Sequence, residues 1–148
     1  MTTLMLVRHG ETVDNANRIM QGQTQGQLNE TGIRQAEEVA ISLAGEHVDA
    51  VVSSDLKRSY DTACIIANKH GLDVSTTKLL RERDWGSFTG RYIPDLKEEK
   101  WPDDIESLDH LLYRAKIFLD FVRSEYPDHS VVAVGHGIID KAIQAVYY

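Results

Sequence analysis

Hydrophobic residues along the chain form short continuous runs that alternate with longer segments of helical spacing. Short apolar runs predict buried strands, and apolar residues recurring every three or four positions predict amphipathic helices. Strands are expected at residues 4–7, 48–52, 74–79 and 131–134. Helices are expected at residues 33–44, 56–69, 108–122 and 138–146. This alternation predicts an α/β fold: a three-layer α/β/α sandwich around an open, mostly parallel sheet.

Residues with strong local preferences set the expected ends of these elements. Asn29 is a plausible N-cap for the first long helix, and Asp55 is the expected N-cap of the second. Pro127 should end the helix that begins near residue 108. The segment 86–104 contains glycines and prolines and is expected to be mostly loop.

Length and charge narrow the classes of function. A chain of 148 residues fits one domain spanning residues 1–148. The formal charge of −7 argues against non-specific nucleic-acid binding, which needs a basic face. Cys64 is the only cysteine and no apolar run is long enough to cross a membrane, so a cytoplasmic protein without membrane contacts is expected.

Three polar motifs follow predicted strands directly. Arg8-His9-Gly10 follows the first strand, residues 53–58 follow the second, and Gly135-His136-Gly137 follows the last. Ligand sites of open parallel sheets form outside the carboxyl ends of the strands. If these strands are neighbours, we expect the two histidines and Arg58 to meet at one edge of the sheet.

The residue types in these motifs suit anion chemistry. A neutral imidazole can act as a nucleophile, and the guanidinium of Arg8 beside it suits phosphate oxygens. Gly10 is expected to let a ligand approach the backbone closely. Taken singly, each motif also has a plain alternative: a surface dipeptide at a strand end, or a solvated arginine at a helix start. Two histidines could also bind a metal, but no third ligand lies at a matching spacing, so no metal site is expected.

Taken together, these motifs resemble the histidine phosphatase superfamily, the phosphoglycerate-mutase-like proteins, in order from residue 4 to about residue 143. Single pieces are weak evidence, but their order and spacing are specific. The resemblance rests on residues 8–12, on Gly22, Leu28, Gly32 and Gln35-Ala36, on residues 53–59 with Thr62, on Leu80-Arg81-Glu82 with Gly86 and Gly90, and on residues 135–137.

The resemblance implies a role for each matching residue. His9 would be the histidine that is transiently phosphorylated, and Glu82 the acid that protonates the leaving oxygen and then activates water. The remaining implied residues hold the phosphate: Arg8, Arg58 and His136, with Asn15, Thr24 and the backbone N–H of Gly137 lining the same pocket. Two fixed guanidiniums would meet the phosphate charge without a metal, so no cofactor is expected.

The expected activity is metal-independent hydrolysis of a phosphomonoester, with a small phosphorylated metabolite as the substrate and a monomer or homodimer as the assembly. Only 16 residues (106 minus 90) separate Gly90 from the segment before the next helix, and such a short lid should admit water. A cofactor-dependent phosphoglycerate mutase is the alternative, because Arg83 follows Glu82 as in mutases that use this arginine for substrate.

Two departures from the family pattern favour a third interpretation, a catalytically silent phosphate-binding module. Asp14 stands where an aromatic residue is common, which adds negative charge near the phosphate site. The chain also ends 11 residues after Gly137 (148 minus 137), where relatives continue. A natural minimal form and a C-terminally short chain are both consistent with this ending.

Overall fold

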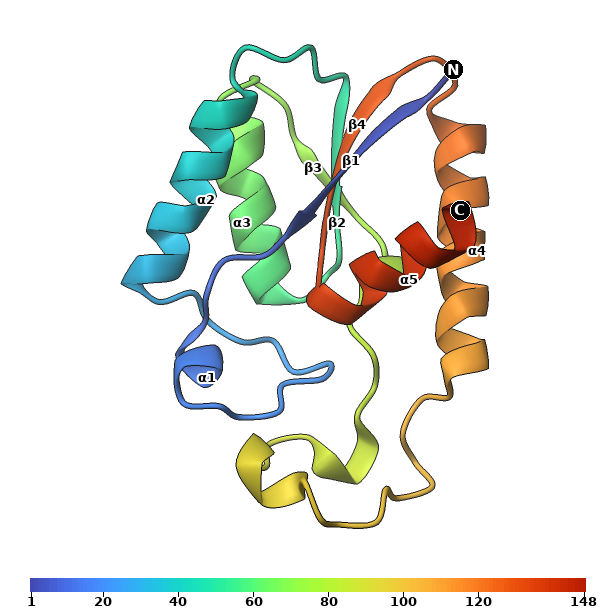
Figure 1. The fold of residues 1–148 in the computed structure, drawn as a ribbon. Coiled ribbons are helices and arrows are strands. Elements are labelled where there is room, and N and C mark those ends of the chain that lie inside the picture. The colour runs from blue at the N-terminus through green and yellow to red at the C-terminus, as the bar shows by residue number, and fades with distance from the viewer.

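The computed structural model describes residues 1–148 and contains one sheet with helices on both sides (Figure 1). The strands run in the spatial order β1-β4-β2-β3, and every neighbouring pair is parallel. Their bounds are Thr3–Arg8 for β1, Ala50–Ser53 for β2, Val74–Thr76 for β3 and Ser130–Gly135 for β4. The three-layer, parallel α/β architecture expected from the hydrophobic pattern is confirmed.

Four long helices cover the sheet. α2 and α3 pack together on one face, and α4 and α5 pack together on the other (Figure 1). Their bounds are Glu30–Leu43 for α2, Lys57–Asn68 for α3, Leu108–Glu125 for α4 and Gly137–Tyr147 for α5. A short helix, α1 (Val13–Ala16), and three 3₁₀ turns, Lys78–Leu80, Gly86–Phe88 and Ile93–Leu96, occupy the connections at the end of the sheet where the strands finish.

The side chains of β1, β2 and β4 alternate between two separate cores. Val131 and Ala133 of β4 face α4 and α5, where Phe118 is fully buried. Val132 and Val134 of the same strand face α2 and α3. A strand buried on both faces must be apolar at every position, which explains the continuous Val-Val-Ala-Val run.

The ends of the elements differ from the predictions at α3 and β3, whereas the start of α2 agrees with its prediction. Asp55 is not the cap of α3: the N-cap is Leu56, which makes no side-chain hydrogen bond, and the Asp55 carboxylate instead pairs with the Arg81 guanidinium at 2.7 Å. β3 ends at Thr76 rather than Leu79, because the chain turns there into a 3₁₀ helix capped by Thr77. The Asn29 cap is confirmed, since its side chain accepts from the Gly32 N–H at 2.8 Å.

The sheet brings the polar motifs to one edge. β1 and β4 are in register from Thr3 beside Ser130 to Arg8 beside Gly135, so the two histidine motifs leave the sheet side by side. The Ser54 N–H donates to the Val134 carbonyl at 3.1 Å, which brings the β2 motif beside the end of β4. None of the helices is long and apolar enough to cross a membrane.

Candidate active site

His9 lies directly after β1 and is buried, with 8% of its surface exposed. Its backbone N–H donates to the Gly135 carbonyl at 3.2 Å, which extends the pairing with β4. The imidazole Nδ1 lies 2.6 Å from the Gly10 carbonyl oxygen. A carbonyl can only accept, so Nδ1 carries the proton and Nε2 carries the lone pair. The fold therefore presents Nε2 as the nucleophilic atom.

Arg58 contacts the unprotonated Nε2 of His9, across the ring from the Gly10 carbonyl. Its Nε–H donates to His9 Nε2 at 3.4 Å, which agrees with an unprotonated Nε2. Its terminal nitrogens donate to backbone carbonyls of the loop before α2: Nη2 to Gly22 at 2.7 Å, and Nη1 to Thr24 and Gln25. These acceptors hold a guanidinium that is almost fully buried, with 1% of the residue exposed.

His136 meets His9 at the centre of the site. The ring centroids lie 5.0 Å apart with an interplanar angle of 63°. The Nε2 atom of His136 is 2.7 Å from the Ser54 hydroxyl, whereas its Nδ1 is buried without a hydrogen-bond partner. The predicted convergence of both imidazoles and Arg58 is thus confirmed.

The surroundings keep both imidazoles neutral. Burial lowers the pKa of His9 to about 4; the bond to the Gly10 carbonyl opposes this shift, and the charges of Arg58 and Arg8 add to it. Burial, followed by the charge of Arg58, also lowers the pKa of His136 well below its usual value. Burial lowers the pKa of Arg58 to about 10, so this guanidinium remains charged at neutral pH.

A cavity of about 430 Å³ opens onto His9 and is lined by Arg8, His9, Glu11, Asn15 and Gln35. Arg8 is exposed and Asn15 is half-buried. The Oδ1 atom of Asn15 accepts from the Thr12 N–H at 3.1 Å, which leaves its amide nitrogen as the group free to donate into the cavity. A larger cavity of about 590 Å³ lies against β1, α4 and α5 and contains none of the predicted site residues.

Two predicted phosphate ligands remain, Gly137 and Thr24. Gly137 lies against Arg8, whereas Thr24 contacts the site only through its backbone. Gly137 is the first residue of α5, and the Arg8 guanidinium carbon would lie 3.4 Å from a Cβ built there, so Arg8 packs against this helix start. The side chain of Thr24 makes no contact with the other site residues: the residue is exposed, and it is its backbone carbonyl that binds Arg58.

Gly10 has a packing role that the sequence did not predict. A Cβ at position 10 would lie 2.3 Å from the Gly32 carbonyl oxygen, and one at position 32 would lie 2.0 Å from the Glu11 carbonyl oxygen. The two glycines therefore let the segment after β1 cross the start of α2 backbone to backbone. Gly10 is required for this packing, and its expected part in the approach of a ligand stays a prediction.

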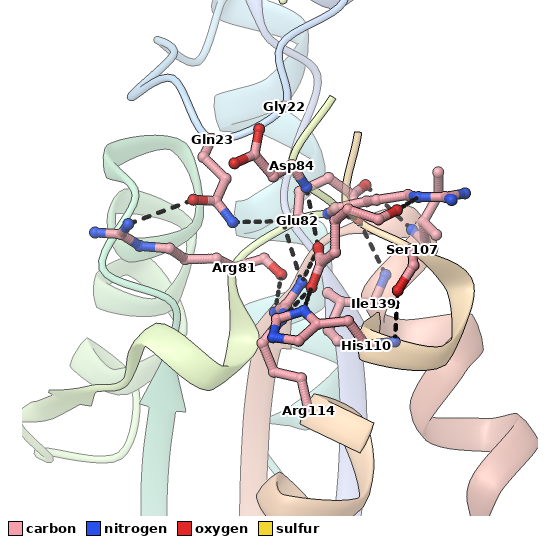
Figure 2. Close-up of polar contacts among 12 residues, drawn as sticks. Gly22, Gln23, Arg81, Glu82, Asp84, Ser107, His110, Arg114 and Ile139 are labelled. Carbon is pink, nitrogen blue, oxygen red and sulfur yellow. Dashed lines mark hydrogen bonds and ion pairs between the residues drawn. The ribbon is translucent and has the colours of Figure 1, made fainter. Parts of the chain in front are cut away.

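Glu82 lies at the start of α5 (Figure 2). Its Oε2 accepts from the Ile138 N–H at 3.1 Å, and its Oε1 accepts from the N–H groups of Ile139 and Arg83 at 3.0 Å each. These bonds place a carboxylate at the positive end of the helix that follows His136. The charge of Glu82 also raises the pKa of Arg58, against the larger effect of burial.

Neither arginine beside Glu82 pairs with its carboxylate. Arg81 binds Asp55 through two bonds of 2.7 Å. The Arg83 guanidinium lies over the rings of Trp85 and Trp101, 5.1 and 5.4 Å from their centroids, and its Nε donates to a backbone carbonyl. In the mutase alternative, the Arg83 guanidinium would bind substrate. In this structure it stacks on the indole rings of Trp85 and Trp101.

Asp140 is a buried site group that sequence reasoning missed. Burial, followed by the charge of Glu82, raises its pKa to about 8, against the opposing effect of Arg8. Its Oδ1 has no hydrogen-bond partner and lies 2.4 Å from where a Cβ on Gly135 would be. The available signal was an acidic residue among Ile138, Ile139 and Ala142, within the apolar positions of the helix.

No group of three or more His, Cys, Asp or Glu side chains is arranged to hold a metal ion. The site instead combines a buried neutral imidazole, a second imidazole with an unpartnered nitrogen, charged guanidiniums and a carboxylate. This arrangement suits an anion that reacts at His9 Nε2.

Comparison with known proteins agrees with this site. The family model of the histidine phosphatase superfamily (branch 1) matches residues 4–147. The chain therefore belongs to the histidine phosphatase superfamily.

Relatives within the superfamily carry two kinds of name. The chain is 34% identical to phosphoserine phosphatase 1 of Hydrogenobacter thermophilus, over 97% of the chain and 74% of that protein. It is 45% identical to the probable phosphoglycerate mutase GpmB of Yersinia pestis, over 68% of the chain and 48% of that protein. Among solved structures, a mycobacterial glucosyl-3-phosphoglycerate phosphatase is 31% identical with a TM-score of 0.84, over 97% of the chain and 77% of that structure.

Proposed function

We propose that this protein is a metal-independent phosphomonoesterase that acts through a phosphohistidine on His9. The observation that supports this most directly is the state of the His9 ring: Nδ1 is committed to the Gly10 carbonyl, and Nε2 is free of a proton and faces Arg58. The lowered pKa of His9 means that the ring is neutral, and therefore nucleophilic, at neutral pH.

The proposed reaction has two displacements at phosphorus. In the first, the Nε2 lone pair forms a P–N bond while the ester P–O bond breaks, and Glu82 gives a proton to the leaving oxygen. In the second, water attacks phosphorus, the P–N bond breaks and returns its electron pair to Nε2, and Glu82 takes a proton from the water. Catalysis of phosphoryl transfer is mostly positioning and charge stabilisation, which the guanidiniums of Arg8 and Arg58 would supply.

The buried, unpartnered Nδ1 of His136 supports the same proposal. A buried polar atom without a partner is costly, and a bound phosphoryl oxygen would relieve that cost. Arg58 Nε–H, which now donates to His9 Nε2, would likewise turn to an oxygen of the phosphoryl group on that nitrogen. The amide of Asn15 and the N–H of Gly137 complete the proposed set of donors.

The test is hydrolysis of p-nitrophenyl phosphate in the presence of EDTA by the wild-type protein and by His9→Ala, with the exposed His129→Ala as the matched control. We expect activity in the wild type and the control and none in His9→Ala. Brief exposure to substrate should leave an acid-labile phosphohistidine at position 9. Full activity of His9→Ala would refute the proposal.

A phosphoglycerate mutase is the second candidate, supported by the 45% identity to proteins named as probable mutases. It predicts isomerisation of a phosphoglycerate in the presence of a bisphosphate primer. The position of Arg83 favours the phosphatase, because this guanidinium stacks on Trp85 and Trp101 and its Nε donates to the Glu106 carbonyl, which suits a structural role better than binding of a second substrate group. Release of inorganic phosphate without isomerisation would exclude the mutase.

A further inference from the structure

A buried ion pair between Arg114 of α4 and Glu106, two residues before that helix begins, holds the backbone on both sides of Glu82. The side chains of Arg114 and Glu106 are 11% and 5% exposed, and they meet through two bonds of 2.8 and 3.0 Å. A paired arginine and glutamate buried to this extent need further hydrogen bonds to offset their loss of water. Those further bonds all go to the segment that carries Glu82 and to the start of α4 (Figure 2).

Arg114 binds the backbone that precedes Glu82 and the carbonyl of Glu82 itself. Its Nη1 donates to the carbonyls of Leu79 at 2.9 Å and Arg81 at 2.6 Å, and its Nη2 donates to the Glu82 carbonyl at 3.3 Å. The Glu82 carbonyl also accepts from the Gln23 side chain at 3.2 Å. Three backbone carbonyls within residues 79–82 thus bind one guanidinium that reaches them from α4.

Glu106 binds the two residues that follow Glu82 in the chain. Its Oε1 accepts from the Asp84 N–H at 3.1 Å, and its backbone exchanges a second bond with Asp84 at 2.8 Å. Its carbonyl accepts from Arg83 Nε at 2.8 Å. Burial works against ionisation of Glu106, but bonds from Arg114, Asp84 and His110 hold its pKa below the usual value.

We propose that the Glu106–Arg114 pair is a positioning device for the general acid: it fixes the backbone of residues 79–84 so that the Glu82 carboxylate stays at the start of α5, the helix that follows His136. Neither side chain hydrogen-bonds to His9, Arg58 or His136, and both bind the backbone around Glu82, so each would act through Glu82. This inference rests on the proposed function and adds to it the residues that decide how well Glu82 protonates a leaving oxygen.

The proposal has a signature that a purely structural role lacks. Proton donation matters for a poor leaving group such as the serine oxygen of phosphoserine, and hardly at all for p-nitrophenolate. Arg114→Met should therefore lower kcat/KM on phosphoserine by about 10²-fold, the loss that a misplacement of roughly 1 Å can cause. It should lower kcat/KM on p-nitrophenyl phosphate by less than about threefold, because kcat/KM reports only the transfer of the phosphoryl group to His9 and excludes the later hydrolysis step, in which Glu82 acts as a base for either substrate.

The matched control is Arg123→Met, on the same helix, where the side chain is 60% exposed and pairs only with Asp120 at 3.7 Å. It should leave both activities unchanged. Arg114→Lys and Glu106→Gln give milder variants if Arg114→Met fails to fold, which thermal unfolding will show. Lysine cannot reach three carbonyls and a carboxylate at once, so Arg114→Lys should show the same substrate-dependent loss in a smaller degree.

The decisive measurement is a double-mutant cycle with Glu82→Gln on phosphoserine. If Arg114 acts through Glu82, adding Arg114→Met to Glu82→Gln should lower kcat no further. Equal losses on both substrates, or additive losses in the cycle, would overturn the inference. Failure of the proposed function would look different, since His9→Ala would then retain activity or the wild type would lack it.

Discussion

The imidazole of His136 stands edge-on to that of His9, with 5.0 Å between the ring centroids, and each ring is held by a partner on its far side. Two imidazoles this close, with Arg58 and Arg8 nearby, disfavour protonation of either ring. Both histidines lie at the ends of neighbouring strands, so the sheet itself sets their separation. The pH behaviour of the protein should follow from this pair.

Activity should persist to lower pH than an ordinary histidine allows. Because the pKa of His9 is about 4, kcat/KM corrected for ionisation of the substrate should stay level from pH 7 to about pH 5 and halve near pH 4. Folding stability should change in the same region: the unfolded state, with the usual value of 6.5, takes up a proton below that pH, so stability falls between about pH 6.5 and pH 4. An activity profile that halves near pH 6.5 would contradict the neutral, buried ring.

Asp140 gives the opposite dependence of stability on pH. The folded state keeps this carboxyl protonated up to about pH 8, whereas the unfolded state releases the proton near pH 4. Stability is therefore lost as pH rises between these values, by up to about 1.4 kcal/mol per pH unit. Asp140→Asn should remove that loss, so urea unfolding should show a stability gain on the order of 2 kcal/mol larger at pH 7 than at pH 5. The exposed Asp73→Asn is the control, and an equal gain at both pH values would argue against a neutral Asp140.

Glu82→Gln tests the general acid directly. Glutamine keeps the size of the side chain but cannot donate a titratable proton, so kcat/KM on phosphoserine should fall by roughly 10²–10⁴-fold. The kcat/KM on p-nitrophenyl phosphate should fall much less, because p-nitrophenolate leaves without a proton and kcat/KM excludes the later hydrolysis of the phosphohistidine. Equal losses on the two substrates would mean that Glu82 is not the acid.

Gly32→Ala should destabilise the fold without altering any polar group of the site. The added methyl would lie 2.0 Å from the Glu11 carbonyl oxygen, so the start of α2 must move away from the segment after β1. We expect a loss of about 2 kcal/mol or more in the free energy of unfolding, measured by urea titration. Gly45→Ala is the control, since no atom lies within 4 Å of a Cβ there. Its effect should stay within about 1 kcal/mol of zero.

The parts of this molecule that the sequence predicts are those governed by local pattern. β4 reads as a strand because both of its faces are buried, and Asn29 reads as a cap because its side chain binds three residues ahead. The convergence of His9 and His136 follows from the parallel order of their strands. Each of these inferences needs only periodicity or the geometry of a parallel sheet.

The parts that could not be predicted depend on partners far away in the chain. Asp55 has the composition of a cap, but Arg81, 26 residues later, takes its carboxylate. Arg58 was expected at the site, yet the three loop carbonyls that orient it follow only from the path of residues 22–25. The anchoring of Glu82 on α5 likewise joins residues 56 and 57 positions apart. Local propensity carries no information about such contacts.

Arg58 would have two roles, because the guanidinium that would bind the substrate also donates to carbonyls of residues 22–25 and so fixes the path of that loop. A lysine would keep the positive charge but lose these hydrogen bonds, so a substitution of Arg58 should disturb the loop as well as anion binding. Anion binding and the path of residues 22–25 would thus be tied to a single side chain.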